Sequence, residues 1–278
     1  MQTPGRVTPA PRNPKPVRHL ESFVDDLQAT GRYTFRWKEA LDVLGVGDRA
    51  LRASARRLSA KGRLVMPRRG FLVIVPTEYR SAGAPPPAWF IDELMCFHEH
   101  PYYVGILSAA ALHGAAHHQP QEFQVVTDTM LRPAQAGRSR IRFFSKRSLD
   151  KTATAEVKTP TGTLRVSTPE ATAFDLLRYI RGAGGLGNVA TVLSGLAEKI
   201  HPDALVDAAR ADAEIPHAQR LGCLLDRVGG KDKTEALAAW VSAQKPPRVV
   251  LRPGRPSRGF PLDRRWQVIL NEPIEADL

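Results

Sequence analysis

The sequence predicts an α+β protein in three successive parts: short helices with a hairpin, a larger mixed α/β segment, and a helical C-terminal part. Two patterns carry this prediction. Apolar residues recur at helical spacing in the first and last parts, and strand-like apolar runs fill the middle without a regular strand-helix-strand repeat. With 42% hydrophobic and 24% charged residues over 278 positions, the composition is that of an ordinary globular protein with a sizeable core.

The N-terminal part begins with helices. Apolar residues at helical spacing run from Leu20 to Leu27 and again from Trp37 to Leu44, and Gly45 follows as a natural helix-terminating residue. After a tight turn, Asp48 is expected to cap a third helix that runs to about Lys61. Gly62 ends this helix, and strands are expected at 63–66 and 71–75, joined by a turn over Pro67–Gly70.

This order of three helices and a basic hairpin is typical of a winged helix-turn-helix, which places its last helix in the major groove of DNA. Helical spacing puts Arg49, Arg52 and Arg56 on the face opposite the apolar residues. We expect the hairpin tip to carry Arg68 and Arg69 to the flanking DNA backbone or minor groove. The complete set of expected DNA-binding residues is Arg49, Arg52, Arg56, Arg57, Arg68, Arg69, Arg36 and Lys38.

Charge supports this interpretation. The chain has 40 Lys and Arg against 28 Asp and Glu, a net +12, and a pI of about 10.1. Residues 1–80 hold sixteen cations and seven acids, a net +9, so the excess is concentrated in the first third. A polyanion, double-stranded DNA, is therefore the expected partner, while the arginine that reads a base stays open.

The expected domains are a flexible basic arm at 1–16, a winged helix-turn-helix at 17–80, a proline-rich linker at 81–87 and an α+β domain at 88–278. Three consecutive prolines make 81–87 the best boundary, and each side is expected to bury its own apolar faces. Beyond it, helices are expected near 88–99 and 107–113, and Thr168 is expected to cap the first of five C-terminal helices. Strands are expected at 102–104, 122–127, 140–144, 155–158, 163–166, 248–251 and 266–270.

Residues 18–200 resemble the AbiEi family of antitoxins from type IV toxin-antitoxin systems. The resemblance depends on the order of segments behind a winged helix: 107–114 with its terminal His-Gly, Gln119-Pro120, and the runs 123–127, 141–144 and 166–177. It implies a bacterial repressor that binds inverted repeats in its own operon, and a second domain that counters a nucleotidyltransferase-like toxin. Residues 200–278 neither strengthen nor weaken the match.

Two other functions are weighed against this one. Asp128 followed by Glu156 and Lys158 has the residue order of a magnesium-dependent nuclease, although an acid-x-lysine pair arises by chance in most chains of this length. The second alternative is a transcription factor whose large domain senses a ligand. Because the nuclease signal is weak, we expect no enzyme activity and no catalytic residues.

Metal and cofactor sites are not expected. Cys96, His98, His100, His113, His117 and His118 are close in sequence, but no carboxylate accompanies them at metalloenzyme spacing. A second basic region comprises Arg132, Arg138, Arg140, Arg142, Lys146 and Arg147, which form either a solvated face or a further anionic contact. Two cysteines and no apolar span fit a cytoplasmic protein with no membrane partner.

Overall fold

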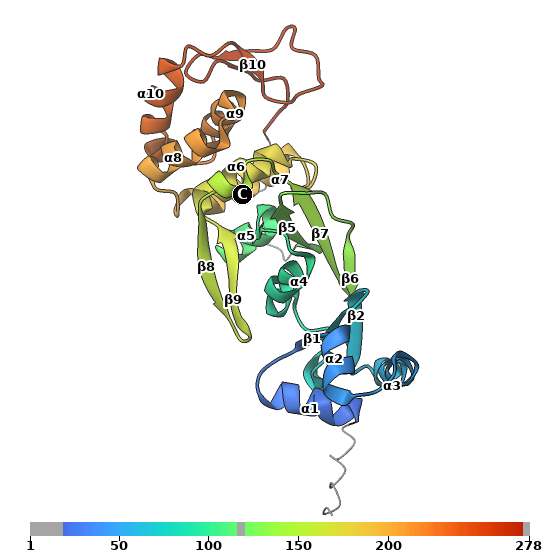
Figure 1. Ribbon diagram of the computed structural model, residues 1–278. Helices are drawn as coiled ribbons and strands as arrows, with labels where there is room; N and C mark the ends of the chain where they lie inside the picture. Colours follow the sequence, from blue (N-terminus) through green and yellow to red (C-terminus); the bar gives the residue numbers. More distant parts are fainter. Residues whose placement is uncertain (1–18, 116–119, 275–278) are drawn as a thin grey trace, which may run out of the picture.

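The computed structural model describes residues 19–115 and 120–274, so the arm expected at 1–16 lies outside the described residues. The described chain is elongated, with the N-terminal helices at one end and the C-terminal strands at the other (Figure 1). It combines helices with three β-sheets, which confirms the α+β class. Within the described ranges, no helix is both long enough and apolar enough to span a bilayer.

Three helices and a small antiparallel sheet form the N-terminal end. Their order is α1 (Leu20–Ala29), β1 (Thr34–Arg36), α2 (Trp37–Leu44), α3 (Asp48–Ala60), β2 (Leu64–Arg68) and β3 (Phe71–Ile74). The sheet has the strand order β1-β3-β2. The inward faces of the helices form one cluster with Phe35, Leu64, Leu72 and Ile74, and the ring of Phe23 meets that of Phe35 edge-on at 5.4 Å between centroids.

Local geometry corrects two of the expected boundaries. Gly47 rather than Asp48 is the N-cap of α3, because the extended backbone of Gly47 (ψ 155°) precedes Asp48 as the first helical residue. The hairpin turn is also shorter than expected, since Arg68 pairs with Phe71 across the ladder and leaves Arg69 and Gly70 as the turn. Gly70 adopts a φ of 90°, which favours glycine at this position.

A six-stranded mixed sheet forms the middle of the molecule. Its strands, in the spatial order β6-β7-β5-β4-β9-β8, are β4 (Tyr102–Val104), β5 (Glu122–Thr127), β6 (Ala134–Ala136), β7 (Ser139–Ser145), β8 (Thr154–Thr159) and β9 (Gly162–Ser167). The pairs β5–β7 and β4–β9 are parallel and the others antiparallel. Helices α4 (Ile91–His98) and α5 (Ile106–Leu112) pack on this sheet.

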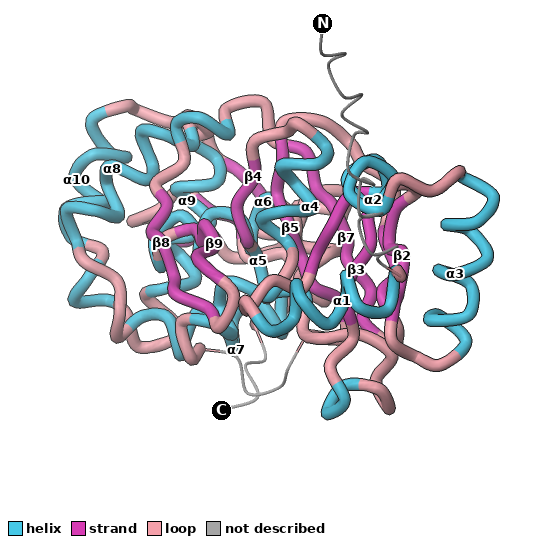
Figure 2. Tube along the Cα trace, turned by 60° about the horizontal axis from the view of Figure 1, so that its bottom comes forward, coloured by secondary structure: helices cyan, strands magenta, loops and turns pink. Residues whose placement is uncertain are grey.

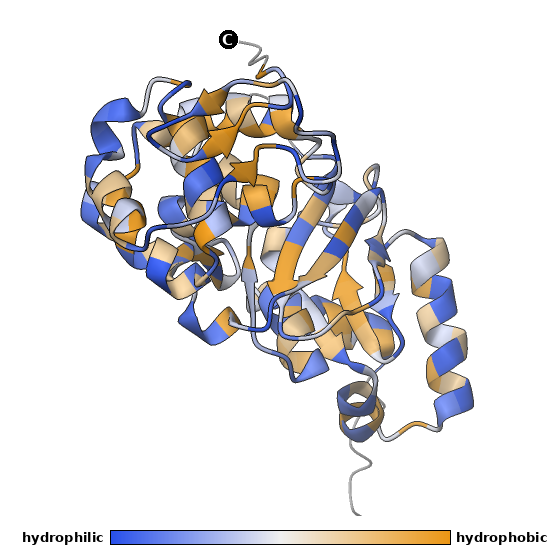
Figure 3. Cartoon of the chain, turned by 90° about the horizontal axis from the view of Figure 1, so that it is seen from above, coloured by the Kyte–Doolittle hydropathy of each residue, from blue (hydrophilic) through white to orange (hydrophobic). Residues whose placement is uncertain are grey.

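Helices follow the sheet. They are α6 (Pro169–Arg178), α7 (Leu186–Ala197), α8 (Pro202–Asp212), α9 (Ile215–Leu225) and α10 (Glu235–Ala243). Elsewhere in the described chain, short 3₁₀ turns lie at Thr77–Tyr79, Pro87–Trp89 and Leu149–Lys151, and another precedes α10 at Lys231–Lys233. The Thr168 hydroxyl accepts a hydrogen bond from the backbone of Ala171, as expected of the cap. Figure 3 shows hydrophobic residues gathered along the strands and inner helix faces, with hydrophilic residues on loops and outer turns.

The chain closes with a third sheet of very short strands, β10 (Val249–Val250), β11 (Leu262–Asp263) and β12 (Val268–Ile269), in the order β10-β12-β11. Trp266 fixes this sheet to α9. Its ring is fully buried against the backbone of Gly222, and its indole N–H donates to Asp226 Oδ2 at 2.8 Å.

The segment at 81–87 is packed rather than open. The Ala82 carbonyl accepts a hydrogen bond from the backbone of Arg138 at 2.8 Å, and Ala84 is buried. A Cβ on Gly137 would lie 2.2 Å from the Ala82 oxygen, so the two backbones touch. The N-terminal side buries a cluster of its own, but Val65, Phe71 and Val73 of its sheet belong to the same apolar cluster as the central sheet, so its apolar faces are not all buried within that side.

Candidate nucleic-acid interface

Helix α3 lies at the outer edge of the N-terminal end, outside strands β2 and β3 (Figure 2). It buries Leu51, Ala55 and Leu58 against the N-terminal cluster. Because a helix advances about 100° per residue, the arginines spaced between these positions face away from the protein. Arg49, Arg52, Arg56 and Arg57 are all exposed. The helix therefore presents a basic face whose orientation is fixed by its buried face.

Asp48 ties α3 to the rest of the N-terminal end. Its carboxylate accepts the indole N–H of Trp37 at 2.9 Å and the Nε–H of Arg52 at 2.6 Å. The Trp37 hydrogen bond, the Arg52 pair and the charge of Arg69 together lower the pKa of Asp48, with Trp37 the largest cause. A carboxylate in the first turn also suits the positive end of the helix dipole. The start of α3 is thus locked onto α2.

The cations of α3 differ in how far they are already paired. Arg52 is bound to Asp48, and Arg57 donates to the Ser54 hydroxyl at 2.9 Å. Arg49 and Arg56 make no hydrogen bond or ion pair with any residue that the structure describes. These two guanidinium groups are the ones available to a partner without breaking an internal contact.

The two cations at the start of α2 lie in different settings. Arg36 is the N-cap of α2, and its guanidinium carbon lies 5.8 Å from the centre of the Phe97 ring on α4. That stacking directs Arg36 towards the central sheet rather than along α3. Lys38 is exposed on α2, with no ion-pair partner in the described ranges.

Adjacent arginines in the hairpin have different environments. Arg68 is half-buried: it donates to the backbone carbonyls of Arg132 and Pro133, and its guanidinium carbon lies 5.9 Å from the Phe143 ring centre. Burial, with the charge of Arg132, lowers its pKa. Arg69 is exposed in the turn and close enough to act on Asp48. Arg68 therefore holds the hairpin against the central sheet, and only Arg69 extends the α3 surface.

The second basic region does not form one free surface. Lys146 is buried, with its ammonium 3.0 Å from Asp175 Oδ1. Arg140 and Arg142 share the carboxylate of Glu122 at 3.2 and 3.4 Å, and Arg142 also lies over the Phe144 ring. At least half of the six cations are thus committed to internal contacts.

A buried ionic network, which sequence reasoning missed, joins β7 to α6 and α8. Lys146 pairs with Asp175, and Arg178 donates to Asp212 Oδ1 at 2.9 Å, while the other Asp212 oxygen contacts His217 Nδ1 at 2.9 Å. The carboxylate of Asp175 is fully buried and that of Asp212 nearly so. No sequence motif signals this network, because its pairs Lys146–Asp175 and Arg178–Asp212 join residues 29 and 34 positions apart.

Burial acts to raise the pKa of both aspartates of this network, but their net pKa shifts are opposite. In Asp175, burial raises the pKa, and the nearby Lys146 offsets this only in part. Burial also acts to raise the pKa of Asp212, but hydrogen bonds from His217 and Arg178 outweigh it, so the pKa of Asp212 is lowered. Lys146, Arg178 and Asp212 line a cavity of about 560 Å³ at the carboxyl ends of β5 and β7.

The nuclease candidates do not come together. Asp128 follows β5 and lies 3.0 Å from His100 Nδ1. Glu156 and Lys158 lie on the edge strand β8, which is three strand spacings of about 4.8 Å away from β5 in the sheet. A shared magnesium ion needs carboxylates within its own coordination distance. Asp128, Glu156 and Lys158 therefore do not form the shared magnesium site that their order in the sequence suggested.

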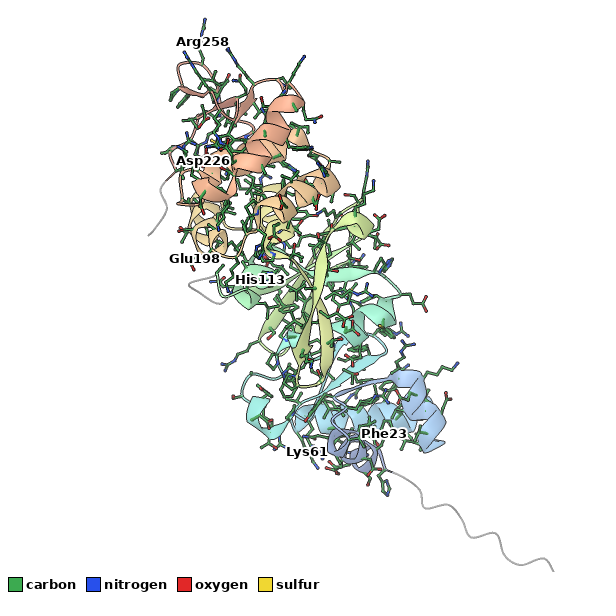
Figure 4. The ribbon with its side chains drawn as sticks, turned by 90° about the vertical axis from the view of Figure 1, so that its left-hand side faces the viewer. Phe23, Lys61, His113, Glu198, Asp226 and Arg258 are labelled. Carbon is green, nitrogen blue, oxygen red and sulfur yellow. The ribbon has the colours of Figure 1, made fainter. Side chains whose placement is uncertain are left out.

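The histidines are placed separately. His113 ends α5 with its Nε2 2.7 Å from the Ser167 carbonyl (labelled in Figure 4), and His98 packs against Phe97 and Phe143. Burial, with the charge of Arg68, lowers the pKa of His98. His117 and His118 lie outside the described residues. Within the described part of the chain, no three His, Cys, Asp or Glu side chains are arranged to hold a metal ion.

The fold has a solved counterpart. The crystal structure of the RV2827C protein from Mycobacterium tuberculosis superposes with a TM-score of 0.64 over 90% of this chain and 90% of that chain, at 16% sequence identity. At this identity the likeness concerns the fold alone. No curated protein matches the chain. Residues 103–227, from β4 through α9, match the family model of the AbiEi antitoxin C-terminal domain.

Proposed function

We propose, from the premise that this chain carries an AbiEi antitoxin C-terminal domain at residues 103–227, that it is a DNA-binding transcriptional repressor and the antitoxin of a type IV toxin-antitoxin system. In this proposal residues 19–80 act as a winged helix-turn-helix, with α3 in the major groove of operator DNA. The remainder of the chain counters a nucleotidyltransferase-like toxin, and the protein is not an enzyme.

The observation that carries the DNA-binding part is the exposed arginine face of α3. Arg49 and Arg56 have no internal partner in the described chain, and Arg69 adds a third cation beside the start of the helix. A guanidinium group matches the O6 and N7 edge of guanine in two hydrogen bonds and equally matches phosphate. The concentration of net charge in residues 1–80 supports the same conclusion.

The structure changes the residue set of the proposal. We leave Arg68 out of the proposed contacts because its guanidinium donates to the backbone carbonyls of Arg132 and Pro133, between β5 and β6. Arg36 is likewise directed towards Phe97. The proposed DNA contacts are therefore Arg49, Arg52, Arg56, Arg57, Arg69 and Lys38, together with any cations of residues 1–16.

The test compares operator with random duplex DNA. If Arg49 or Arg56 reads guanine, Arg49→Gln or Arg56→Gln should weaken operator binding by about 1 to 3 kcal/mol and reduce the preference for operator over random DNA. The matched control is Arg210→Gln, an exposed helical arginine paired with Asp207 on α8, which should leave both affinities unchanged. The measurement is fluorescence anisotropy on the DNA upstream of the gene.

If both α3 variants keep their preference for operator over random DNA, the bases are recognised by another part of the protein. The antitoxin part is tested separately, by co-expression with a nucleotidyltransferase-like toxin encoded beside the gene. Both α3 variants should still rescue growth if protection belongs to residues 103–227. Failure of the wild-type chain to rescue would refute the antitoxin role and leave DNA binding standing.

A further inference from the structure

Half of the chain's net charge is gathered in one short C-terminal stretch. Residues 245–265 hold seven cations and a single acid, Asp263, for a net +6 of the total +12. This stretch follows residue 227, where the match to the antitoxin domain ends. It includes the connection from β10 to β11, and residues 253–261 of that connection are all exposed. Arg255 and Arg258 lie on this exposed connection, which the proposed repressor function does not use.

Hydrogen bonds hold the base of this loop in one conformation. Asn271 is buried, and its side chain spans the loop with four hydrogen bonds to the backbone. Its Oδ1 accepts from the Arg252 N–H at 2.9 Å, and its Nδ2 donates to the carbonyls of Arg252, Pro256 and Arg255 at 3.0, 3.2 and 3.3 Å. These bonds fix the backbone of the loop and do not involve the side chains of its arginines. A fixed loop loses less entropy when it binds a partner.

Three arginines line one cavity beside the loop base. Arg181, Arg252 and Arg255 line one cavity of about 360 Å³, together with Ile180, Pro253 and Gly254. Within the described residues, the ion pairs of these arginines are with Glu272, whose Oε2 lies 3.7 Å from Arg252 Nε and 3.3 Å from Arg255 Nε. One carboxylate cannot neutralise three cations, so the cavity carries a net positive charge. A planar guanidinium group suits the tetrahedral oxygens of a phosphate.

The same loop also presents an aromatic ring. Phe260 is 45% exposed, next to the exposed Arg258 and Gly259, and Arg258 has no ion-pair partner among the described residues. Exposed aromatic rings interleaved with arginines are the common means of holding unpaired bases, which stack on the ring while the cations follow the phosphates. An acidic protein surface would need the cations but not the ring.

The position of this loop separates it from α3. It lies at the end of the molecule opposite the N-terminal helices (Figure 1), and Figure 4 shows Arg258 pointing away from the ribbon at the far end from Phe23 and Lys61. We propose that the loop 252–260, with Arg181, is a second binding site, specific for the phosphate backbone and unpaired bases of a single-stranded nucleic acid.

The experiment measures binding of labelled single-stranded 12-mers, one RNA and one DNA of the same sequence, to the full chain by fluorescence anisotropy. Arg258→Gln with Phe260→Ser should lower affinity for the single strands at least tenfold, because it removes one phosphate contact and the stacking surface. Neither side chain supports the fold, so the thermal midpoint should not change. Preference for RNA over DNA would indicate recognition of the 2′-hydroxyl.

Two controls make the result decisive. Arg49→Gln with Arg56→Gln on α3 should leave single-strand affinity unchanged, and the loop variant should leave affinity for operator duplex unchanged. Arg181→Gln, which alters the cavity but not the loop, should weaken single-strand binding as well. Equal binding by wild-type and loop variant would overturn the proposal, as would a loop variant that loses binding of an acidic peptide but not of nucleic acid.

Discussion

At the scale of single residues, the clearest feature is the pair of oppositely tuned aspartates in the centre of the molecule. Asp175 is fully buried, and its Oδ2 has no hydrogen-bond partner in the described structure. Asp212 is also buried but accepts from both Arg178 and His217. A buried charge with complete partners stabilises the fold only while it is ionised, so stability should depend on pH through Asp212.

Asp212→Asn should reduce the free energy of unfolding by about 3 kcal/mol at neutral pH, because it removes the charge that pairs with Arg178 and His217. The pKa of Asp212 is lowered in the fold, so its contribution is complete above the pKa of an unfolded aspartate, about 3.9, and is lost as pH falls through the lower folded value. The gap between wild-type and variant should therefore close below about pH 4.

Urea unfolding at a series of pH values measures this gap. The control is Asp207→Asn on the same helix, an exposed partner of Arg210, which should change stability by less than about 0.5 kcal/mol. A gap that stays constant down to about pH 3 would show that the loss comes from packing rather than from charge.

At the scale of elements, the third sheet depends on one close contact with α9. The Trp266 ring lies over Gly222 so closely that a Cβ there would sit 2.2 Å from the nearest ring carbon. Alanine is the better helix former by about 1 kcal/mol, so propensity alone would favour it at this helical position. Packing makes alanine unfavourable here, because its methyl group would collide with the buried Trp266 ring.

Gly222→Ala should therefore destabilise the protein, by about 1 to 3 kcal/mol, although it raises helix propensity. The effect should be smaller in a Trp266→Leu background, because the smaller side chain leaves space for the new methyl group. Denaturation midpoints of the two single variants and the double variant give the coupling energy. Strictly additive losses would mean that Trp266 and Gly222 do not constrain each other.

The sequence predicted most elements because their patterns are local. The five C-terminal helices and most strands of the central sheet follow from apolar periodicity, as do the exposed positions of Arg49, Arg52 and Arg56. Strands β1, β6 and β11 were missed, since two or three residues are too few to show alternation. The Lys146 network and the Trp266 contact were also missed, because they join residues that are distant in sequence.

At the scale of the whole molecule, the N-terminal end is joined to the central sheet by more than a linker. Strands β2 and β3 share an apolar cluster with the sheet, Trp89 contacts the rings of Tyr33 and Tyr79, and Gly83 touches Gly137. Arg68 adds hydrogen bonds to the backbone after β5. These contacts hold α3 in a set orientation relative to the rest of the chain.

Variants of the neighbouring residues Arg68 and Arg69 distinguish the contact between the N-terminal end and the central sheet from contact with DNA. Arg68→Gln should lower the thermal midpoint by about 3 to 6 °C, since a hydrogen bond to a charged group contributes about 1.5 to 3 kcal/mol and each kcal/mol corresponds to about 2 °C in a chain of this size. It should also speed proteolysis within residues 81–87, because the junction loosens. The salt dependence of DNA binding should stay as in wild type.

Arg69→Gln should change DNA binding and leave the stability of the protein unchanged. The thermal midpoint should be unchanged, because Arg69 is exposed and forms no hydrogen bond with the described residues. If Arg69 contacts a phosphate, the slope of log K against log salt should become less steep by about 1 out of about 5 for six phosphate contacts. Scanning calorimetry and salt titrations on operator duplex measure both quantities. If the two variants change the thermal midpoint and the salt slope equally, the two hairpin arginines have the same role. Arg68 would then contact DNA despite its hydrogen bonds to backbone carbonyls.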